Sequence, residues 1–304
     1  MSRIHEALKK AAEERSTQLA AGLEAGVGEE AGETRRLVTG ASEVGLPVLP
    51  PRIVPGGHQA MPLRYEELVM RCVHPEWRLD PLKSVFQDSI VEHAVSERFR
   101  TLRSRLYQIA STRTLRRLLI TSSVAGEGKS FVASNVALSI VQQPDLRVLL
   151  LDADMRASRL HAALGAPNRP GLSDYLRGEA SEIEIVQKGM EKKLFFIPGG
   201  SQVPNPSELL LSERMRQLLD RFTPMFDWII IDSPPAMPVH DASILADLTD
   251  GVLLVVQAGS TNGEIAEKTA AEFQDKNLLG IVLNHVEKHD SYRDYYYGYR
   301  EDKG

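Results

Sequence analysis

The chain has 304 residues, of which 42% are hydrophobic, so it can bury one large core or one domain with an appendage. Its formal net charge of −5 gives it no general basic character, which argues against nucleic acid as a partner. The single cysteine, Cys72, excludes a disulfide framework within the chain and favours a reducing cytosol.

The first 87 residues show little sign of a packed core. Apolar residues of 1–20 share one face of a short helix, which would either dock on a partner or remain a solvated helix. Residues 21–60 are rich in Gly, Glu and Pro, so we expect a flexible linker there. We expect residues 61–87 to form an irregular region before the main domain. No apolar run approaches the roughly 20 residues that span a bilayer, so any membrane role is expected to come through a partner.

A stronger helical pattern follows. Ser89 and Glu92 have the spacing of a capping box, and apolar residues then recur at steps of four and three: Val95, Phe99, Leu102, Leu106 and Ile109. Elsewhere on this helix, Glu97, Arg100 and Arg103 lie three residues apart. Such a charged face is typical of a solvated surface, and the alternative is a surface where arginines meet carboxylates of another subunit.

Residues 118–130 have the order of strand, glycine-rich loop and helix that a phosphate-binding P-loop requires. Gly126 and Gly128 can adopt positive φ, which turns backbone N–H groups toward an anion, and the helix N-terminus adds its dipole. Lys129 would then reach the β- and γ-phosphates, and the Ser130 hydroxyl would ligate Mg²⁺. A glycine-rich turn of some other α/β protein is the alternative.

Two further buried strands end in acidic residues. Residues 147–151 lead into Asp152 and Asp154, at a position where open α/β sheets place ligands. Neighbouring carboxylates repel each other unless a cation or a hydrogen-bond donor lies beside them, which indicates a ligand site. Alternatively, Asp152 or Asp154 could cap the following helix. Residues 228–231 lead into Asp232, which follows the Walker B pattern of a carboxylate that holds Mg²⁺ directly or through water.

Strands and helices alternate through the rest of the chain. Further strands are predicted over 194–197, 251–256 and 279–284, with helices that start near Pro204 and at Glu264. This order predicts an α/β fold with a doubly wound, mainly parallel sheet of the P-loop NTPase type, a largely flexible N-terminal extension and a flexible C-terminal tail.

The tail, residues 288–304, is rich in tyrosine: Tyr292, Tyr295, Tyr296, Tyr297 and Tyr299. Three consecutive tyrosines fit neither the strand nor the helix period. Beside a nucleotide site, such a row of phenols indicates a phosphoryl acceptor. The alternative is an aromatic tail that binds a partner.

Together these motifs resemble the bacterial tyrosine kinases (BY-kinases), specifically the free-standing cytoplasmic kinases of capsular and exopolysaccharide export systems. The resemblance extends from about Glu97 to the C-terminus. The family's Walker A loop, second acidic motif and Walker B strand correspond to residues 125–130, 149–156 and 229–235. Its oligomerisation motif falls on Glu97, Arg100 and Arg103, which turns the interpretation of that helix toward subunit docking.

The resemblance implies a kinase domain over 88–287 that transfers the ATP γ-phosphoryl group to tail tyrosines of a neighbouring subunit in a ring. It implies catalytic roles for Lys129, Asp152 and Asp154, with Asp152 as the first candidate for accepting the tyrosine proton. It assigns Mg²⁺ to Ser130, Asp154 and Asp232. It assigns the nucleotide to Ala125, Gly126, Glu127, Gly128, Lys129, Ser130 and Phe131. It also implies protein tyrosine substrates, a membrane-embedded co-polymerase-type activator, and a cytoplasmic protein recruited to the membrane by that partner.

Three other functions compete with this one. A Min/Par-type switch ATPase carries a signature lysine five residues before the P-loop lysine, where this chain has Val124. A GTPase would need an Asn-Lys-x-Asp pattern, which residues 284–287 lack. A scaffold that binds ATP without turnover would not need the intact Lys129 and its acidic companions.

Overall fold

The structure is a computed structural model that describes residues 63–84, 86, 93–189 and 193–286. Several predictions concern residues outside these ranges: the helix over 1–20, the linker over 21–60, the capping pair Ser89 and Glu92, and the tyrosine tail over 288–304.

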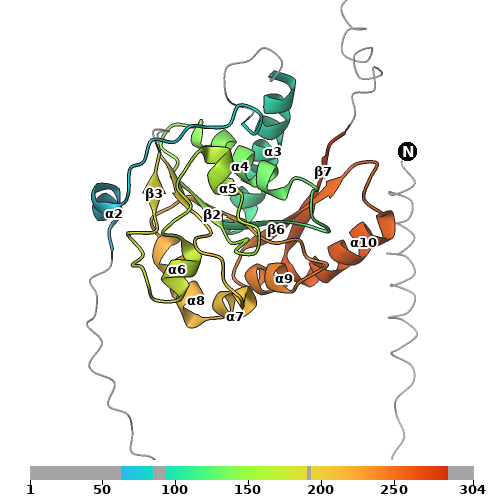
Figure 1. The fold of residues 1–304 in the computed structure, drawn as a ribbon. Coiled ribbons are helices and arrows are strands. Elements are labelled where there is room, and N and C mark those ends of the chain that lie inside the picture. Colours follow the sequence, from blue (N-terminus) through green and yellow to red (C-terminus); the bar gives the residue numbers. More distant parts are fainter. Residues whose placement is uncertain (1–62, 85, 87–92, 190–192, 287–304) are drawn as a thin grey trace, which may run out of the picture. The chain divides into compact units, whose positions relative to one another are not determined.

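A seven-stranded sheet forms the centre of the described domain (Figure 1). Its strand order is β3-β4-β2-β5-β1-β6-β7, and every neighbouring pair is parallel except β3 with β4. The strands are β1 (Arg117–Ser122), β2 (Val148–Asp152), β3 (Gln187–Lys188), β4 (Leu194–Ile197), β5 (Trp228–Asp232), β6 (Gly251–Gln257) and β7 (Leu278–Asn284). The doubly wound, mainly parallel fold that the sequence predicts is therefore confirmed.

Helices cover both faces of this sheet, and alternate residues of each central strand enter two separate cores. In β1, Leu118 and Ile120 join the core under α3, α4 and α5, while Leu119 joins the core on the other face. The helices of the first face are α3 (His93–Thr112), α4 (Lys129–Val141) and α5 (Leu160–Leu164). The other helices are α2 (Tyr65–Arg71), α6 (Leu172–Leu176), α7 (Pro206–Leu210), α8 (Glu213–Phe222), α9 (Asp241–Ala246), α10 (Gly263–Glu272) and the 3₁₀ turn η2 (Gln274–Lys276).

The segment over 61–87 is expected from the sequence to be irregular, but its residues 65–71 form helix α2, which packs on the domain. Leu68 and Cys72 are 0% and 5% exposed and lie four residues apart, on one face of the helix and its cap. The Tyr65 ring lies 3.8 Å from the Arg147 guanidinium and makes an edge contact with Phe195. Seven residues are too few for a reliable period, which is why the sequence did not reveal this helix.

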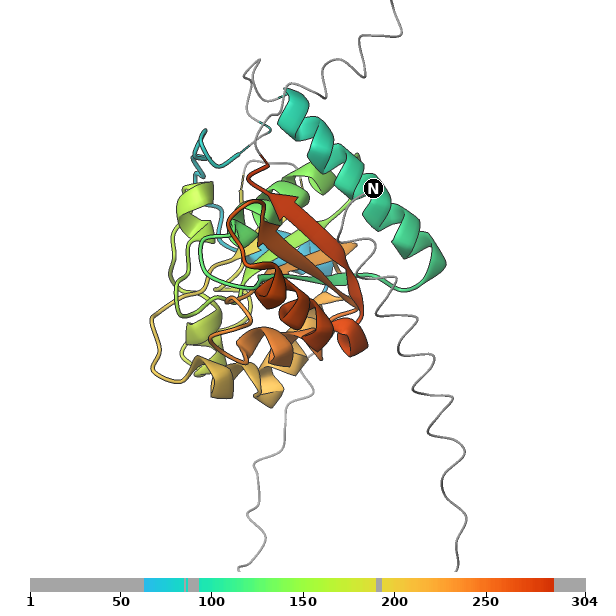
Figure 2. The same ribbon diagram turned by 90° about the vertical axis from the view of Figure 1, so that its right-hand side faces the viewer.

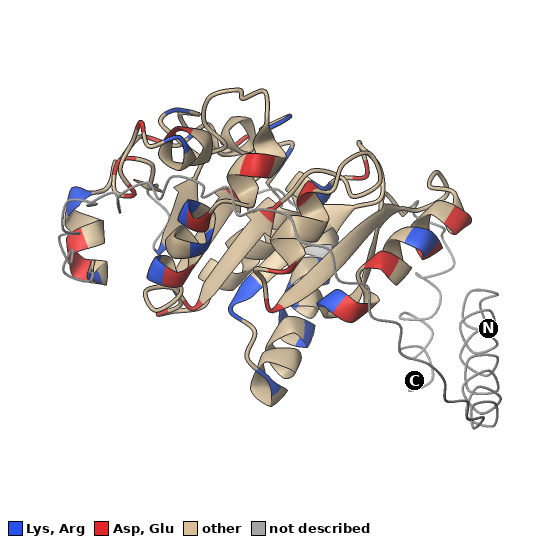
Figure 3. Ribbon diagram, turned by 90° about the horizontal axis from the view of Figure 1, so that it is seen from below, with Lys and Arg blue, Asp and Glu red and all other residues tan. Residues whose placement is uncertain are grey.

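Helix α3 runs beside the edge strand β7 (Figure 2). The two elements line a cavity of about 320 Å³, and Ile281 and Leu283 on β7 are 50% and 60% exposed. Basic and acidic residues are both distributed over the described part of the chain (Figure 3). In the described part of the chain, no helix combines the length and the apolar composition needed to cross a lipid bilayer.

Candidate active site

The loop between β1 and α4 has the backbone shape of a phosphate cradle. Gly126 and Gly128 have φ of +93° and +90°, in the left-handed region that favours glycine. Gly128 caps α4 without a side-chain hydrogen bond, so the first N–H groups of the helix are available to an anion. A Cβ on Gly126 would meet nothing within 4 Å, which leaves open space beside the loop. The sequence thus forms the concave, positively polarised backbone that a phosphate requires.

Glu127 braces this loop from inside. Glu127 is 1% exposed. Its carboxylate accepts hydrogen bonds from the backbone N–H groups of Val124 (2.8 Å) and Gln257 (3.3 Å) and from the Thr261 hydroxyl. The Asn284 amide donates to the Glu127 carbonyl at 2.9 Å. The carboxylate of Glu127 thus ties the loop to the end of β6 and to Thr261, and its backbone carbonyl ties the loop to the end of β7, so its contribution to nucleotide binding is expected from its backbone N–H.

Lys129 lies among the predicted metal-side acids. Its Nζ is 2.7 Å from Asp154 Oδ2 and 3.7 Å from Asp232 Oδ1. Ser130 donates to Asp232 Oδ2 at 2.6 Å. Burial lowers the pKa of Lys129, but attraction to Asp232 and Asp154 more than offsets this and holds the pKa above its ordinary value. The lysine is therefore fully charged at neutral pH, as a phosphate-binding cation must be.

Asp152 is fully buried and held by its own loop. It accepts hydrogen bonds from the Ser158 hydroxyl (2.8 Å) and from the backbone N–H groups of Asp154 (3.1 Å) and Leu160 (3.2 Å). Burial and repulsion from Asp232 raise the pKa of Asp152 to about 7. Burial also raises the pKa of Asp232, to about 6, although the neighbouring ammonium opposes that shift. A carboxylate with a pKa near 7 can take up and release a proton under ordinary conditions.

The oxygen atoms at this site fit Mg²⁺. Asp232 Oδ1 is buried and has no hydrogen-bond partner among the described residues, and the Ser130 hydroxyl lies beside the same carboxylate. Hydroxyl and carboxylate oxygens are ligands that Mg²⁺ prefers. Within the described ranges, no three His, Cys, Asp or Glu side chains form a metal-holding group. The protein would therefore supply only part of the coordination shell, and nucleotide phosphates and water would complete it.

A salt bridge between the exposed Arg156 and the buried Asp241 fixes the loop that carries Asp154. Arg156 donates to both oxygens of Asp241, with Nε at 2.7 Å and Nη2 at 3.2 Å, and to the Ser207 hydroxyl at 2.9 Å. Asp241 is 0% exposed and opens α9, while Ser207 lies in α7. The Arg156 guanidinium therefore ties the loop that carries Asp154 to helices α7 and α9.

The three residues of the predicted oligomerisation motif do not share one surface. Glu97 and Arg100 form an exposed ion pair on α3. Arg103 turns inward, where Nη1 donates to the Ser139 carbonyl at 2.5 Å and Nε is buried without a partner in the described region. The cause is geometric, since each three-residue step falls about 60° short of a full helical turn. Arg103 holds α3 against α4 in this structure, and only the other two side chains face outward.

The structure brings the predicted nucleotide-side residues together, because parallel strands end at one edge of the sheet. Lys129 and Ser130 follow β1, Asp152 and Asp154 follow β2, and Asp232 ends β5. Sequence reasoning missed Thr261, Asn284, Ser158 and Asp241. Only Asp241 carried a local signal, as an acid at the start of a helix. The others act through partners distant in sequence or through a loop without periodicity.

Comparison with known proteins identifies related chains. A sequence profile described as "AAA domain" matches residues 116–276. Tyrosine-protein kinase YwqD of Bacillus subtilis (strain 168) is 37% identical over 211 residues, which are 68% of this chain and 88% of that protein. This chain spans only 27% of the length of the EpsB relatives from Ralstonia nicotianae and Ralstonia solanacearum.

Solved structures agree with this relationship. The crystal structure of the chimerical protein CapA2B2 superposes with a TM-score of 0.64 at 29% identity, over 69% of this chain and 92% of that one. The kinase domain of the Escherichia coli tyrosine kinase ETK superposes with a TM-score of 0.59 at 32% identity, over 64% of this chain and 78% of that one.

Proposed function

Because the chain belongs to the AAA-domain family and, within it, to the bacterial tyrosine-protein kinases, we propose that it phosphorylates its own C-terminal tyrosines with ATP. The acceptors are the tail residues of a neighbouring copy: Tyr292, Tyr295, Tyr296, Tyr297 and Tyr299. The observation that carries the proposal is the contact of Lys129 with Asp154 and Asp232 at the end of the phosphate loop. The kinase relatives favour this function over a Min/Par-type switch ATPase.

The loop and Lys129 bind the phosphates. Backbone N–H groups from Gly126 to Ser130 surround the phosphate oxygens, and the ammonium neutralises charge that develops on the transferred group. Bound Mg²⁺, held by Ser130, Asp154 and Asp232, would supply further neutralisation of that charge. The glycines and the brace on Glu127 keep these donors in place before substrate arrives, so little reorganisation is needed during the reaction.

Asp152 accepts the proton of the reacting phenol. The tyrosine oxygen forms a bond to the γ-phosphorus, the bond from that phosphorus to the β,γ-bridging oxygen breaks, and the phenolic proton moves to the carboxylate. The raised pKa of Asp152 suits this role, since a base with a pKa near the working pH combines the correct protonation state with sufficient basicity. Both acids are held by other groups, Asp154 by Lys129 and Asp152 by the Ser158 hydroxyl and two backbone N–H groups, so the raised pKa is what makes Asp152 the first candidate.

Transfer between subunits explains why the acceptors lie on a terminal tail. A tail on a neighbouring subunit of a ring reaches the site at high effective concentration. Glu97 and Arg100 on the outer face of α3 are the residues we assign to contacts between subunits. Each phosphate adds about −1.5 to −2 charge, so phosphorylated tails repel an acid-rich site and loosen the ring.

The cellular setting follows from the resemblance to capsular and exopolysaccharide kinases. In this proposal the protein is cytoplasmic, is recruited to the membrane by an embedded co-polymerase-type activator, and regulates polysaccharide synthesis and export. Other protein tyrosines would be further substrates.

The deciding experiment is incubation of the full chain with ATP and Mg²⁺, with and without the cytoplasmic segment of a candidate activator. Mass spectrometry of the C-terminal peptide then locates phosphate. We expect phosphate on the tail tyrosines in wild type and in Lys193→Met, a control that removes a surface lysine paired with Asp145. We expect none in Lys129→Met. ATP hydrolysis with an unmodified tail, in the presence of a functional activator, would instead assign the protein to the switch ATPases.

A further inference from the structure

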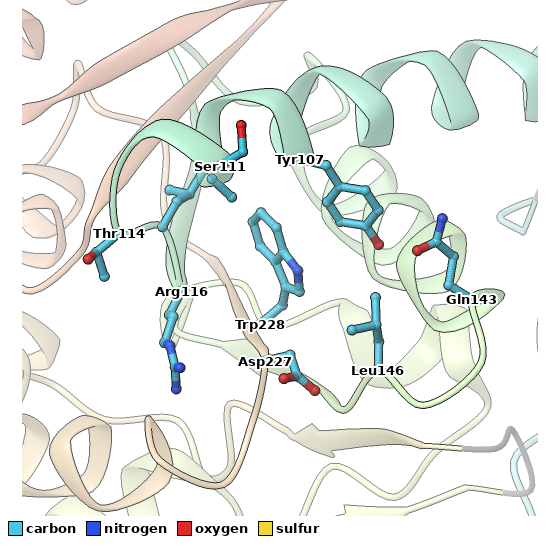
Figure 4. Close-up of a pocket in the computed structure, with 10 residues that line it drawn as sticks. Tyr107, Ser111, Thr114, Arg116, Gln143, Leu146, Asp227 and Trp228 are labelled. Atoms are coloured by element: carbon cyan, nitrogen blue, oxygen red, sulfur yellow. The ribbon is translucent and has the colours of Figure 1, made fainter.

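A groove with an aromatic wall lies at the end of the sheet opposite the phosphate loop (Figure 4). It encloses about 520 Å³ between the last turns of α3 and α4 and the start of β5. Tyr107 from α3 and Trp228 from β5 form its wall, with ring centroids 5.8 Å apart and planes tilted by 40°. Leu146 extends this apolar surface. Because parallel strands all start at this edge, a ligand here leaves the nucleotide site free.

Three side chains of the groove, those of Tyr107, Gln143 and Trp228, carry hydrogen-bond donors without partners among the described residues. The Tyr107 hydroxyl is buried and unpaired among the described residues, and burial raises its pKa to about 12, so it remains a neutral O–H donor. Neither the Trp228 indole nor the Gln143 amide has a hydrogen-bond partner in the described part of the chain. Trp228 is only 4% exposed, so a ligand would contact the ring along the edge that faces the groove. Such a site suits a ligand rich in acceptors.

Proline-rich peptides have this chemistry. Proline lacks an N–H group but keeps its carbonyl, and a polyproline II segment presents its carbonyls to the surroundings with little entropy to lose on binding. Grooves lined by aromatic side chains are a recurring binding mode for Pro-x-x-Pro segments. The exposed carboxylate of Asp227 at the mouth of the groove accepts a hydrogen bond from the backbone N–H of Arg147 at 2.9 Å. It can also accept a hydrogen bond from a cation. The neighbouring Arg116 limits how much a cation gains there.

The chain itself contains such a sequence, outside the described residues. Residues 47–52 read Pro-Val-Leu-Pro-Pro-Arg, in which Pro47 and Pro50 have the Pro-x-x-Pro spacing and Arg52 follows as the cation. We infer that the groove of Tyr107 and Trp228 is a peptide-binding site whose occupant is the segment over 47–52 of a second copy of this protein. An assembly of copies supplies this segment at high effective concentration. The site does not depend on kinase activity.

Fluorine NMR of the full chain tests this inference, because the protein has only two tryptophans. Labelling with 5-fluorotryptophan gives one signal for Trp228 and one for Trp77, which packs edge-on against Phe196 and serves as the internal control. The double variant Pro47→Ala/Pro50→Ala should move the Trp228 signal and leave that of Trp77 unchanged. A synthetic peptide of residues 45–54 added to this variant should restore the wild-type position, whereas the same peptide with Pro47 and Pro50 replaced by alanine should not.

Two neighbouring glutamines provide a matched pair of groove variants. Gln143→Glu places a carboxylate opposite the peptide carbonyls and should weaken peptide binding about tenfold, whereas Gln142→Glu should have no effect. Dilution of wild type should shift the Trp228 signal toward that of the double variant. If the Trp228 signal of the double variant does not change with excess peptide, the inference that the groove binds this peptide is overturned. If the wild-type Trp228 signal differs from that of the double variant but does not change on dilution, the inference that the occupant comes from a second copy is overturned. The Lys129→Met protein should repeat the binding results, which separates this test from the kinase proposal.

Discussion

Lys129 Nζ and Asp154 Oδ2 lie 2.7 Å apart, so the cation of the phosphate loop and the acid of the second motif are directly paired. A phosphate that enters the loop competes with this carboxylate for the same ammonium. Mg²⁺ that enters with the nucleotide would offer the displaced Asp154 another cation.

Replacement of Lys129 by methionine should reduce tail phosphorylation by at least about a hundredfold, since a preorganised charge on the transferred phosphate is lost. It should also lower the free energy of unfolding at pH 8 by about 3 kcal/mol, because Asp154 and Asp232 remain buried without a neighbouring cation. Phosphopeptide quantification and urea denaturation measure the two effects. Lys193→Met should show neither, and equal losses in both variants would contradict the assigned role.

The two loop glycines should differ in how they tolerate alanine. Both have positive φ, so each substitution strains the backbone by about 1–2 kcal/mol. A Cβ on Gly128 would also lie 2.1 Å from Asn284 Nδ2, whereas one on Gly126 meets nothing within 4 Å. Gly128→Ala should therefore weaken nucleotide binding more, as measured by titration of a fluorescent ATP analogue. Adding Asn284→Ala should rescue part of that loss in the Gly128 variant and none in the Gly126 variant.

Stability should fall as pH rises through the range in which the buried acids titrate. The pKa values of Asp152 (about 7) and Asp232 (about 6) lie above the roughly 3.9 of an unfolded aspartate. Between these limits the folded protein binds more protons than the unfolded chain. The contribution of these two acids to the free energy of unfolding therefore decreases from pH 4 to about 7 and levels off above, whereas His161, whose pKa burial lowers, contributes in the opposite direction. Lys129, with its pKa raised, contributes no change until far higher pH.

Urea titrations in metal-free buffer from pH 4 to 8 measure this slope. Asp152→Asn removes one of the two titrations and should make the slope shallower. An identical slope in wild type and Asp152→Asn would show that this carboxyl titrates normally.

Two arginines of α3, Arg100 and Arg103, should separate stability from assembly. Arg103→Ala removes a hydrogen bond to the Ser139 carbonyl and should lower the free energy of unfolding by about 1–2 kcal/mol. Arg100→Ala breaks an exposed ion pair, which is worth at most about 1 kcal/mol. The Arg100 variant should instead reduce the oligomer mass measured by light scattering, if its outer position forms the subunit contact. If the Arg103 variant is monomeric and its stability is unchanged, Arg103 contributes to assembly and the assignment above is wrong.

The central strands were predictable because a strand buried on both faces reads as a continuous apolar run, as in residues 147–151 and 228–231. Asp152 and Asp232 directly follow these apolar runs, so their place at the strand ends was predictable as well. The inward turn of Arg103 was not, since spacing along a helix does not reveal which neighbour packs over it. The role of the Glu127 carboxylate was also hidden, because its acceptor bonds reach residues about 130 positions away. The two-residue strand β3 is too short to leave a pattern.

The order of the strands constrains how this protein acquires its activity. Arg117 on β1 pairs with Ile229 on β5, and Leu118 pairs with Gly251 on β6, so both neighbours of β1 are made more than a hundred residues after it. During synthesis, β1 must wait for β5 and β6 before it can enter the sheet, and such distant pairings form slowly. The brace on Glu127 comes even later, from Thr261 and Asn284. A nascent chain therefore acquires a rigid phosphate loop only when nearly all of its domain has been translated, and an incomplete chain cannot become an active kinase.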